Sequence, residues 1–233
     1  MREPDTSESR ELRSFGRRHG RKFSATQQRL VSDELPRLSI DLSRAAPAAL
    51  PDLFAGTVED VWLEIGFGGG EHLLWQAEHH PQVGLIGCEP YLDGVVKVLS
   101  AMEERKLDRI RLHADDARPL LRWLPEGEIG RAFILFPDPW PKARHQKRRL
   151  VSPALIVALA RIMKPGAELR IATDIGDYAR TALRALQTST AFKWTATGPS
   201  DWRVRPEDWP KTRYEQKALA AGRRCSYLIF VRV

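Results

Sequence analysis

Acidic residues stand at or near the ends of five successive short apolar runs in the sequence. They are Glu64, Glu89, the pair Asp115 and Asp116, Asp138 and Asp174. In an open α/β sheet, ligands bind beyond the carboxyl ends of the strands. One such acid means little, because Asp is a common helix cap. Five in succession indicate a site for a ligand that is cationic or rich in hydrogen-bond donors.

The first of these acids opens a glycine-rich turn, EIGFGGGE, at residues 64–71. Glycines allow a backbone to approach a ligand closely. Glu71 stands where a dinucleotide fingerprint needs its third glycine, and its charge would repel a pyrophosphate at this helix start. The P-loop pattern GxxxxGK[ST] does not occur, which excludes that class of nucleotide hydrolase. The turn therefore favours a ligand without phosphate.

A second segment whose residues indicate a functional site is FPDPWPK, residues 136–142. Its three prolines leave few backbone states, so Asp138 and Trp140 are held with little entropy left to lose. In residues 142–149, five of eight residues are basic and none is acidic. A run of this kind is usually a solvated face. Next to the ligand edge of a sheet, it is better explained as a surface that docks phosphates.

The composition agrees with a polyanionic partner. The chain has 233 residues and a net charge of +7, with a pI near 9.7, and such a charge attracts nucleic acid. The hydrophobic fraction of 42% excludes wholesale disorder. Two cysteines, far apart, exclude a disulfide scaffold and a cysteine-based zinc site. The histidines lack metal-ligand spacing, so we expect no metal.

The sequence has no apolar run of the roughly 18 residues that a membrane span needs. It also has no apolar segment near the N-terminus that would resemble a signal peptide. We therefore expect a cytoplasmic protein with no membrane partner. No obligate protein partner is implied, and the sequence leaves monomer and homodimer open.

Short apolar runs alternate with helical stretches from residue 58 onward. Strands are expected at 61–65, 84–88, 109–113, 132–136, 169–173, 192–197 and 226–233. Helices are expected at 70–80, 92–105, 117–124, 150–163 and 176–187. This alternation is typical of a doubly wound, mostly parallel sheet, and predicts an α/β fold.

Residues 1–24 lack apolar periodicity, and residues 36–56 are rich in Pro and Ala. We predict a basic N-terminal arm and connector over residues 1–56, and one folded domain over residues 57–233. Residues 10–29 contain seven Arg or Lys and one acid. Either a solvated tail or an arm that orders on nucleic acid accounts for this pattern.

The string ExGxGxG at residues 64–70 resembles motif I of class I S-adenosylmethionine-dependent methyltransferases. That cofactor carries a sulfonium and an ammonium and no phosphate, which suits the acids at the strand ends. The resemblance places the ribose hydroxyls on Glu89 and the adenine amino group at Asp116. It implies cofactor contacts at Glu64, Gly66, Gly68, Glu89, Asp116 and Asp138.

FPDPWPK followed by RHxKRR resembles the signature of bacterial tRNA (guanine-N7)-methyltransferases. SFGRRHGR at residues 14–21, ATD at residues 172–174 and TRYE at residues 212–215 resemble further motifs of that family, in the same order. The resemblance implies a Rossmann-like fold with an antiparallel C-terminal strand. It also implies methyl transfer to N7 of a guanine in the variable loop of tRNA.

The same resemblance assigns the substrate side of the site. The target-base contacts it implies are Lys142, Asp174, Thr212, Arg213, Tyr214 and Glu215. The RNA contacts it implies are Arg144, His145, Gln146, Lys147, Arg148 and Arg149. The alternative is a class I methyltransferase that acts on another RNA, a protein or a small molecule.

Guanine N7 has a lone pair and no proton, so the reaction needs no base. The protein must align the reactants and stabilise positive charge on the purine. Asp138 is the expected catalytic residue, either by orienting the methyl donor or by accepting from the guanine N1–H and N2–H edge. For some of the implied base contacts, a purely structural role is the alternative. Asp174 would then cap the next helix, and Thr212 with Glu215 would form a capping box.

Overall fold

The computed structural model describes residues 18, 20 and 22–233. Residues 1–17, 19 and 21 of the predicted arm, which include six of the eight residues of the SFGRRHGR motif, lie outside the described part. Over the described part of the chain, no helix is both long and apolar enough to cross a membrane.

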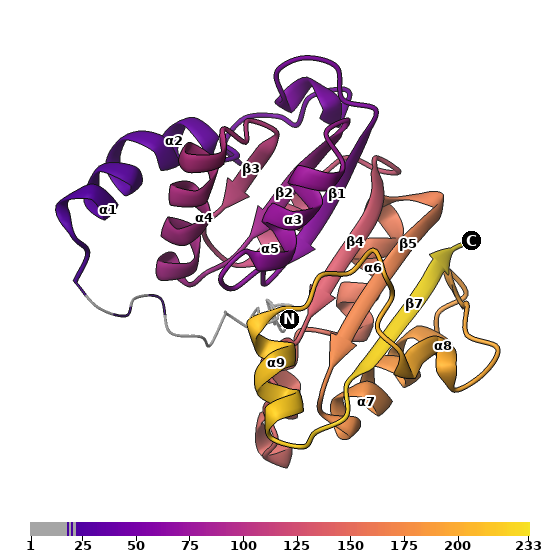
Figure 1. Ribbon diagram of the computed structural model, residues 1–233. Coiled ribbons are helices and arrows are strands. Elements are labelled where there is room, and N and C mark those ends of the chain that lie inside the picture. The colour runs from indigo at the N-terminus through magenta and orange to yellow at the C-terminus, as the bar shows by residue number, and fades with distance from the viewer. Residues whose placement is uncertain (1–17, 19, 21) are drawn as a thin grey trace, which may run out of the picture.

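In the described part of the chain, seven strands form one mixed sheet in the order β3-β2-β1-β4-β5-β7-β6. All of them except β6 are labelled in Figure 1. They are β1 (Asp60–Ile65), β2 (Val83–Cys88), β3 (Ile110–His113), β4 (Ile129–Leu135), β5 (Met163–Thr173), β6 (Phe192–Trp194) and β7 (Ser226–Arg232). The first five run parallel, and β7 runs antiparallel to both β5 and β6. The predicted fold class, with its antiparallel C-terminal strand, is confirmed.

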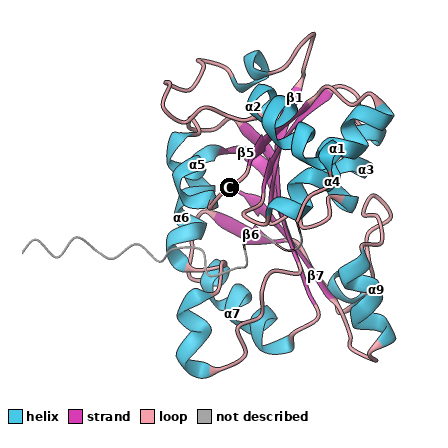
Figure 2. Cartoon of the chain, turned by 90° about the vertical axis from the view of Figure 1, so that its left-hand side faces the viewer, coloured by secondary structure: helices cyan, strands magenta, loops and turns pink. Residues whose placement is uncertain are grey.

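Helices cover both faces of the sheet (Figure 2). Along the chain from β1 they are α3 (Glu71–His79), α4 (Leu92–Arg105), α5 (Ala117–Trp123), α6 (Pro153–Ile162), α7 (Gly176–Gln187), α8 (Ser200–Arg203) and α9 (Arg213–Ala220). A 3-10 turn, η3 (Ala143–Arg148), follows the proline-rich segment. Helices α5, α6 and α7 pack on one face, and α3, α4 and α9 pack on the other.

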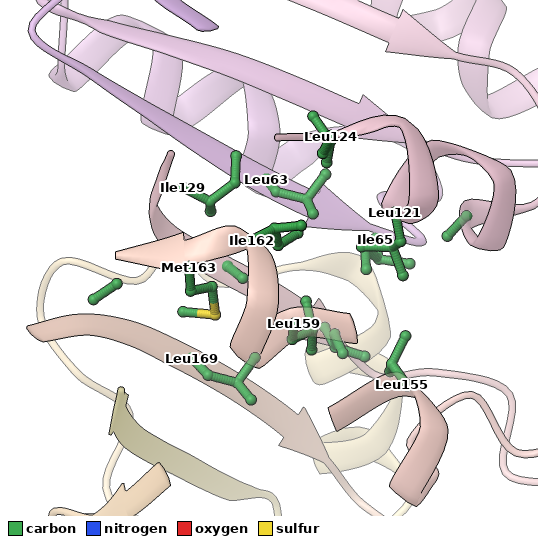
Figure 3. Close-up of a cluster of buried hydrophobic side chains, with 14 of the residues drawn as sticks. Leu63, Ile65, Leu121, Leu124, Ile129, Leu155, Leu159, Ile162, Met163 and Leu169 are labelled. Atoms are coloured by element: carbon green, nitrogen blue, oxygen red, sulfur yellow. The ribbon is translucent and has the colours of Figure 1, made fainter. Parts of the chain in front are cut away.

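The period-2 alternation of strand side chains builds two separate core layers. Leu63 and Ile65 of β1 join the layer beneath α5 and α6, where they meet Leu121 and Leu159 (Figure 3). Trp62, the residue before Leu63, belongs to the opposite layer with residues of α3 and α4. Both faces of the sheet are therefore buried, as a doubly wound fold requires.

The N-terminal segment before β1 packs on the folded core. It forms α1 (Ala25–Arg29), a π-helical turn η1 (Leu30–Glu34), α2 (Leu35–Leu38) and a 3-10 turn η2 (Leu50–Leu53). Leu30 and Leu50 are fully buried, and the Ile40 N–H donates to the carbonyl of Leu112 in β3. This segment covers the edge strand β3, which protects it from pairing with another chain.

Candidate active site

A cavity of about 370 Å³ opens at the carboxyl ends of β1, β2 and β4. The strand order reverses between β1 and β4, so this edge is the switch point where open α/β sheets bind ligands. Its volume lies in the usual range for small-molecule sites. Five of the six predicted cofactor contacts line it, namely Gly66, Gly68, Glu89, Asp116 and Asp138.

The glycine turn after β1 adopts a backbone that side chains would not allow. Gly66, Gly68 and Gly70 all have positive φ, at 78°, 57° and 80°. A Cβ on Gly70 would come within 2.2 Å of Val98 of α4. The turn is therefore shaped both by its left-handed conformation and by close packing against α4.

Glu89, directly after β2, is 8% exposed and faces the cavity. One carboxylate oxygen accepts from the Gly68 N–H at 2.7 Å, and the other accepts from the Tyr91 N–H at 2.9 Å. Burial raises the pKa of Glu89 against the opposing effect of these two hydrogen bonds, and the charge of Asp138 raises it further. Each carboxylate oxygen keeps a second lone pair, so Glu89 can still accept from a ligand hydroxyl.

Asp116 sits at the start of α5 and serves as its N-cap, accepting from the Arg118 N–H at 2.9 Å. Its other oxygen receives the Arg118 guanidinium at 2.6 Å. Asp116 and Arg118 both line the cavity. The capping role therefore does not remove Asp116 from the ligand-facing surface.

The segment after β4 holds Asp138 between two residues with strained backbones. Phe136 has φ of 50° and Trp140 has φ of 39°, both in the left-handed region that non-glycine residues rarely adopt. Asp138 lines the cavity and is exposed. Within the described part of the chain, its carboxylate has no hydrogen bond or ion pair. Strain of this kind persists where the surrounding structure enforces it, and it gathers at functional sites.

Arg149 holds this strained segment in place. Its side chain is nearly fully buried, at 2% exposure. The guanidinium donates to the Pro139 carbonyl at 3.1 Å, to the Thr181 hydroxyl at 2.7 Å and to Asp177 at 2.5 Å. Its partners Asp177 and Thr181 belong to α7, so Arg149 joins the segment of Asp138 to that helix. A buried arginine with three internal partners is not free to bind phosphate in this structure.

We predict that Arg149→Ala lowers the Tm by about 5–10 °C, because it removes three hydrogen bonds and leaves a cavity. Arg149 holds the pKa of Asp177 below its ordinary value. The stability this gives is present at neutral pH and is lost as the pH falls through the lowered pKa. The Tm difference from wild type should therefore shrink in acid. Melting curves of Arg149→Ala and of Lys147→Ala, an exposed neighbour, give the comparison. Equal Tm values would contradict the role of Arg149.

The rest of the basic segment is exposed or half-buried. Arg144 and Lys147 are exposed, as is Lys142. Arg148 lines the cavity with its guanidinium 5.0 Å from the centre of the Trp140 ring. Two further predicted RNA contacts are engaged with the protein, since the His145 ring lies 5.9 Å from Trp140 and Gln146 donates to Asp177.

Glu64 does not reach the main cavity in this structure. Its carboxylate is 3% exposed and lies 2.8 Å from His72 Nδ1 on α3. His72 in turn contacts Gln76, which donates to the carbonyl of Asp208. Glu64 lines only a smaller adjacent pocket, with His72, Thr212 and others. Its predicted role as a cofactor contact remains a prediction.

The TRYE stretch, residues 212–215, lies at the start of α9, and its four side chains have different surroundings. Thr212 caps the helix by accepting from the Glu215 N–H, so the capping alternative is correct for Thr212. Tyr214 lines both pockets, and Arg213 pairs with Glu71 at 3.4 Å. Glu215 points inward at 3% side-chain exposure.

The partners of Glu215 are internal. Its carboxylate accepts from the Tyr227 hydroxyl at 2.7 Å and pairs with Arg205 at 3.2 Å. Burial, together with the hydrogen bond and charge from Glu215, raises the pKa of Tyr227. In this arrangement Glu215 binds α9 to β7, and its predicted contact with the target base remains a prediction.

Asp174 follows β5 and forms an ion pair with Arg223 at 2.5 Å. It is not the cap of α7, because Ile175 occupies that position without a side-chain cap. The Thr173 hydroxyl accepts from the Ile175 N–H instead. The alternative assignment of Asp174 as a helix cap is therefore wrong.

Some residues of the site were not predicted from the sequence. Tyr91 and Arg118 line the cavity, and both interact with predicted site acids. Each follows its acid by two residues, a spacing that could have pointed to them. Arg18 of the arm also reaches this region, since its carbonyl accepts from the Leu92 N–H and its guanidinium pairs with Asp115 at 2.6 Å.

The fold is that of class I methyltransferases. Two solved structures illustrate the likeness: the 16S rRNA methyltransferase KamB, and TrmN from Thermus thermophilus. KamB has a TM-score of 0.58 at 15% identity, over 82% of this chain and 96% of that chain. TrmN has a TM-score of 0.54 at 16% identity, over 78% of this chain and 46% of that chain. At such identities the likeness concerns the fold alone.

Sequence comparison gives the family. A family model described as "Putative methyltransferase" matches residues 59–228. A tRNA (guanine-N(7)-)-methyltransferase from Rhodospirillum rubrum is 50% identical, over 95% of this chain and 88% of the relative. The protein of that name from Brucella anthropi is 46% identical, over 97% of this chain and 99% of the relative. The chain belongs to the tRNA (guanine-N7)-methyltransferase family, as its motifs predict.

Proposed function

We propose that this enzyme transfers a methyl group from S-adenosylmethionine to N7 of a guanine in the variable loop of tRNA. One observation carries the proposal most strongly. The carboxylate of Asp138, which has no hydrogen bond or ion pair among the described residues, faces a cavity of ligand size, between two strained residues and beside an exposed basic segment. A small cationic ligand and a polyanion can meet at such a place.

The residues around the cavity suit the cofactor. Glu89 keeps acceptor capacity for the two ribose hydroxyls, and Asp116 for the adenine amino group. The negative charges of these acids and of Asp138 favour a ligand with a sulfonium and an ammonium. When bound, S-adenosylmethionine supplies an electrophilic methyl group.

The protein's part in the reaction is alignment and electrostatics. Guanine N7 carries a free lone pair, so no side chain has to remove a proton. The Asp138 carboxylate can stabilise the positive charge that develops on the purine, or accept from the guanine N1–H and N2–H edge. The strained backbone on either side fixes it before the substrate arrives, and such preorganisation is a main source of catalysis.

Substrate contacts follow from the surface around the cavity. Arg148 lines it, and Lys142, Arg144 and Lys147 are exposed in the same basic segment; these cations suit phosphates. Tyr214 lines the cavity from the other side. Asp174, Arg213, Thr212 and Glu215 remain proposed base contacts, and in this structure each has a protein partner. Because tRNA is the proposed substrate, we place the enzyme in the cytoplasm.

We predict that the purified protein binds S-adenosylmethionine and does not bind NAD. Glu71 begins α3 with a negative charge where a pyrophosphate would bind, and Glu89 suits a ribose diol. Titration calorimetry with each ligand checks this. Tighter binding of NAD would contradict the assignment of the cavity.

The function itself is tested with S-adenosylmethionine labelled in its methyl group and bulk tRNA that lacks modifications. We expect label in tRNA, and 7-methylguanosine as the labelled nucleoside after digestion. A protein or small-molecule methyltransferase would leave tRNA unlabelled. Label on another base or on protein would overturn the proposal.

A further inference from the structure

A second basic segment lies at the same edge of the sheet as the cavity. Residues 211–224 contain five Lys or Arg and one acid. That acid, Glu215, is buried and already paired, so it does not offset the exposed positive charge. This segment includes α9 and the turn that leads into β7.

Local geometry brings these cations toward the cavity. Tyr214 lines it, and Lys217 stands three residues further along α9, on the same side of the helix. The helix ends in a Schellman motif, in which the Arg223 N–H donates to the Ala218 carbonyl and Gly222 takes φ of 69°. The turn returns the chain to the carboxyl end of β5, where Arg224 precedes β7 (Figure 1).

The cations of this segment differ in whether they are neutralised. Arg213 pairs with Glu71, and Arg223 pairs with Asp174. Lys211, Lys217 and Arg224 are exposed. Among the described residues, no carboxylate forms an ion pair with any of these three. They leave a rim of uncompensated positive charge.

The two basic segments approach the cavity from opposite faces of the sheet. The 142–149 segment is joined to α7 through Arg149. Helix α9 packs through Ala218 on the other layer, and Figure 2 shows α7 and α9 on the two sides of the sheet. A polyanion that lies across the cavity can therefore meet positive charge on both sides of it.

We propose that the C-terminal rim, defined as Lys211, Lys217 and Arg224, binds backbone phosphates of the tRNA substrate. Together with Arg144, Lys147 and Arg148 it holds the RNA on both sides of the target guanine. This inference rests on the proposed function. It adds a docking surface that the sequence motifs do not include.

The test combines Lys217→Ala with Arg224→Ala and measures retention of labelled tRNA on filters between about 50 and 200 mM salt. Removing two phosphate contacts should flatten the log–log salt slope by about 1.5. The Kd for tRNA should rise by about tenfold at the lower salt. The Kd for S-adenosylmethionine should not change. Combining Lys217→Arg with Arg224→Lys keeps both charges and should keep the slope.

The matched control removes two exposed cations from the opposite edge, Arg184 near the end of α7 and Lys193 in β6. In the sheet, Lys193 lies opposite Val231 of β7, at the end of that strand far from the cavity. The Arg184→Ala and Lys193→Ala pair should keep the wild-type slope. If it flattens the slope equally, the effect is net charge and the rim is not a docking surface.

Binding of tRNA is measured separately from its methylation, so the docking surface and the proposed function can be contradicted independently. An unchanged slope in the rim variant, with a wild type that methylates tRNA, overturns the rim and leaves the proposed function intact. A wild type that binds tRNA but never methylates it overturns the proposed function. The slope of the rim variant then still decides the docking surface.

Discussion

Asp138→Asn slows methyl transfer to tRNA by about a hundredfold or more, the usual effect of removing one preorganised electrostatic contact. Asparagine keeps the size of the side chain and the proline-held backbone. Asp138 has no internal partner among the described residues, so the substitution breaks no hydrogen bond of the fold. The loss should therefore appear in the rate and not in the Tm.

Single-turnover methylation from neutral to alkaline pH measures this effect. Because no proton leaves guanine N7, raising the pH should not restore the rate of the variant. Asp52→Asn, an exposed aspartate in η2, is the matched control and should keep the wild-type rate. A folded Asp138→Asn variant with a normal rate would make Asp138 a turn residue. Recovery at high pH would indicate a general base.

Glu89→Ala raises the KM for S-adenosylmethionine by about a hundredfold or more, with a much smaller change in the KM for tRNA. Two hydrogen bonds from ribose hydroxyls to a carboxylate contribute about 1.5–3 kcal/mol each. The variant also leaves the N–H groups of Gly68 and Tyr91 without their acceptor, so a melting curve must accompany the kinetics. Glu104→Ala, an exposed glutamate of α4, is the control.

The raised pKa of Glu89 gives this prediction a second readout. Ribose hydroxyls donate to the ionised carboxylate, so protonation of Glu89 weakens cofactor binding. As the pH falls, the wild type should lose affinity at a higher pH than an ordinary exposed glutamate would cause. Glu89→Ala should lack that part of the pH dependence. Equal cofactor KM values for wild type and variant would remove Glu89 from the ribose site.

The sequence predicts the central sheet well because the pattern of buried strands is local. The helices at Leu92–Arg105 and Gly176–Gln187 have their predicted bounds. The placing of Glu89, Asp116 and Asp138 at one cavity follows from strand order alone.

Other features depend on contacts that no local pattern carries. The helical segment before β1 is held by burial of Leu30 and Leu50 against the core, whereas its Pro and Ala content favours a connector. The predicted RNA contact Arg149 is buried by partners on α7, 28 and 32 residues away. Glu64 and Glu215 likewise turn inward to partners that only the tertiary fold supplies.

In the proposed reaction, N7 of a tRNA guanine is the nucleophile. The most direct measurement is methylation of tRNA transcripts in which 7-deazaguanine replaces guanine, with unsubstituted transcripts in parallel. The base analogue keeps the N1–H and N2–H edge but has carbon in place of N7. We predict that the substituted tRNA binds with nearly the same Kd and accepts no methyl group. Methylation of the substituted tRNA at the unsubstituted rate would show that N7 is not the methyl acceptor.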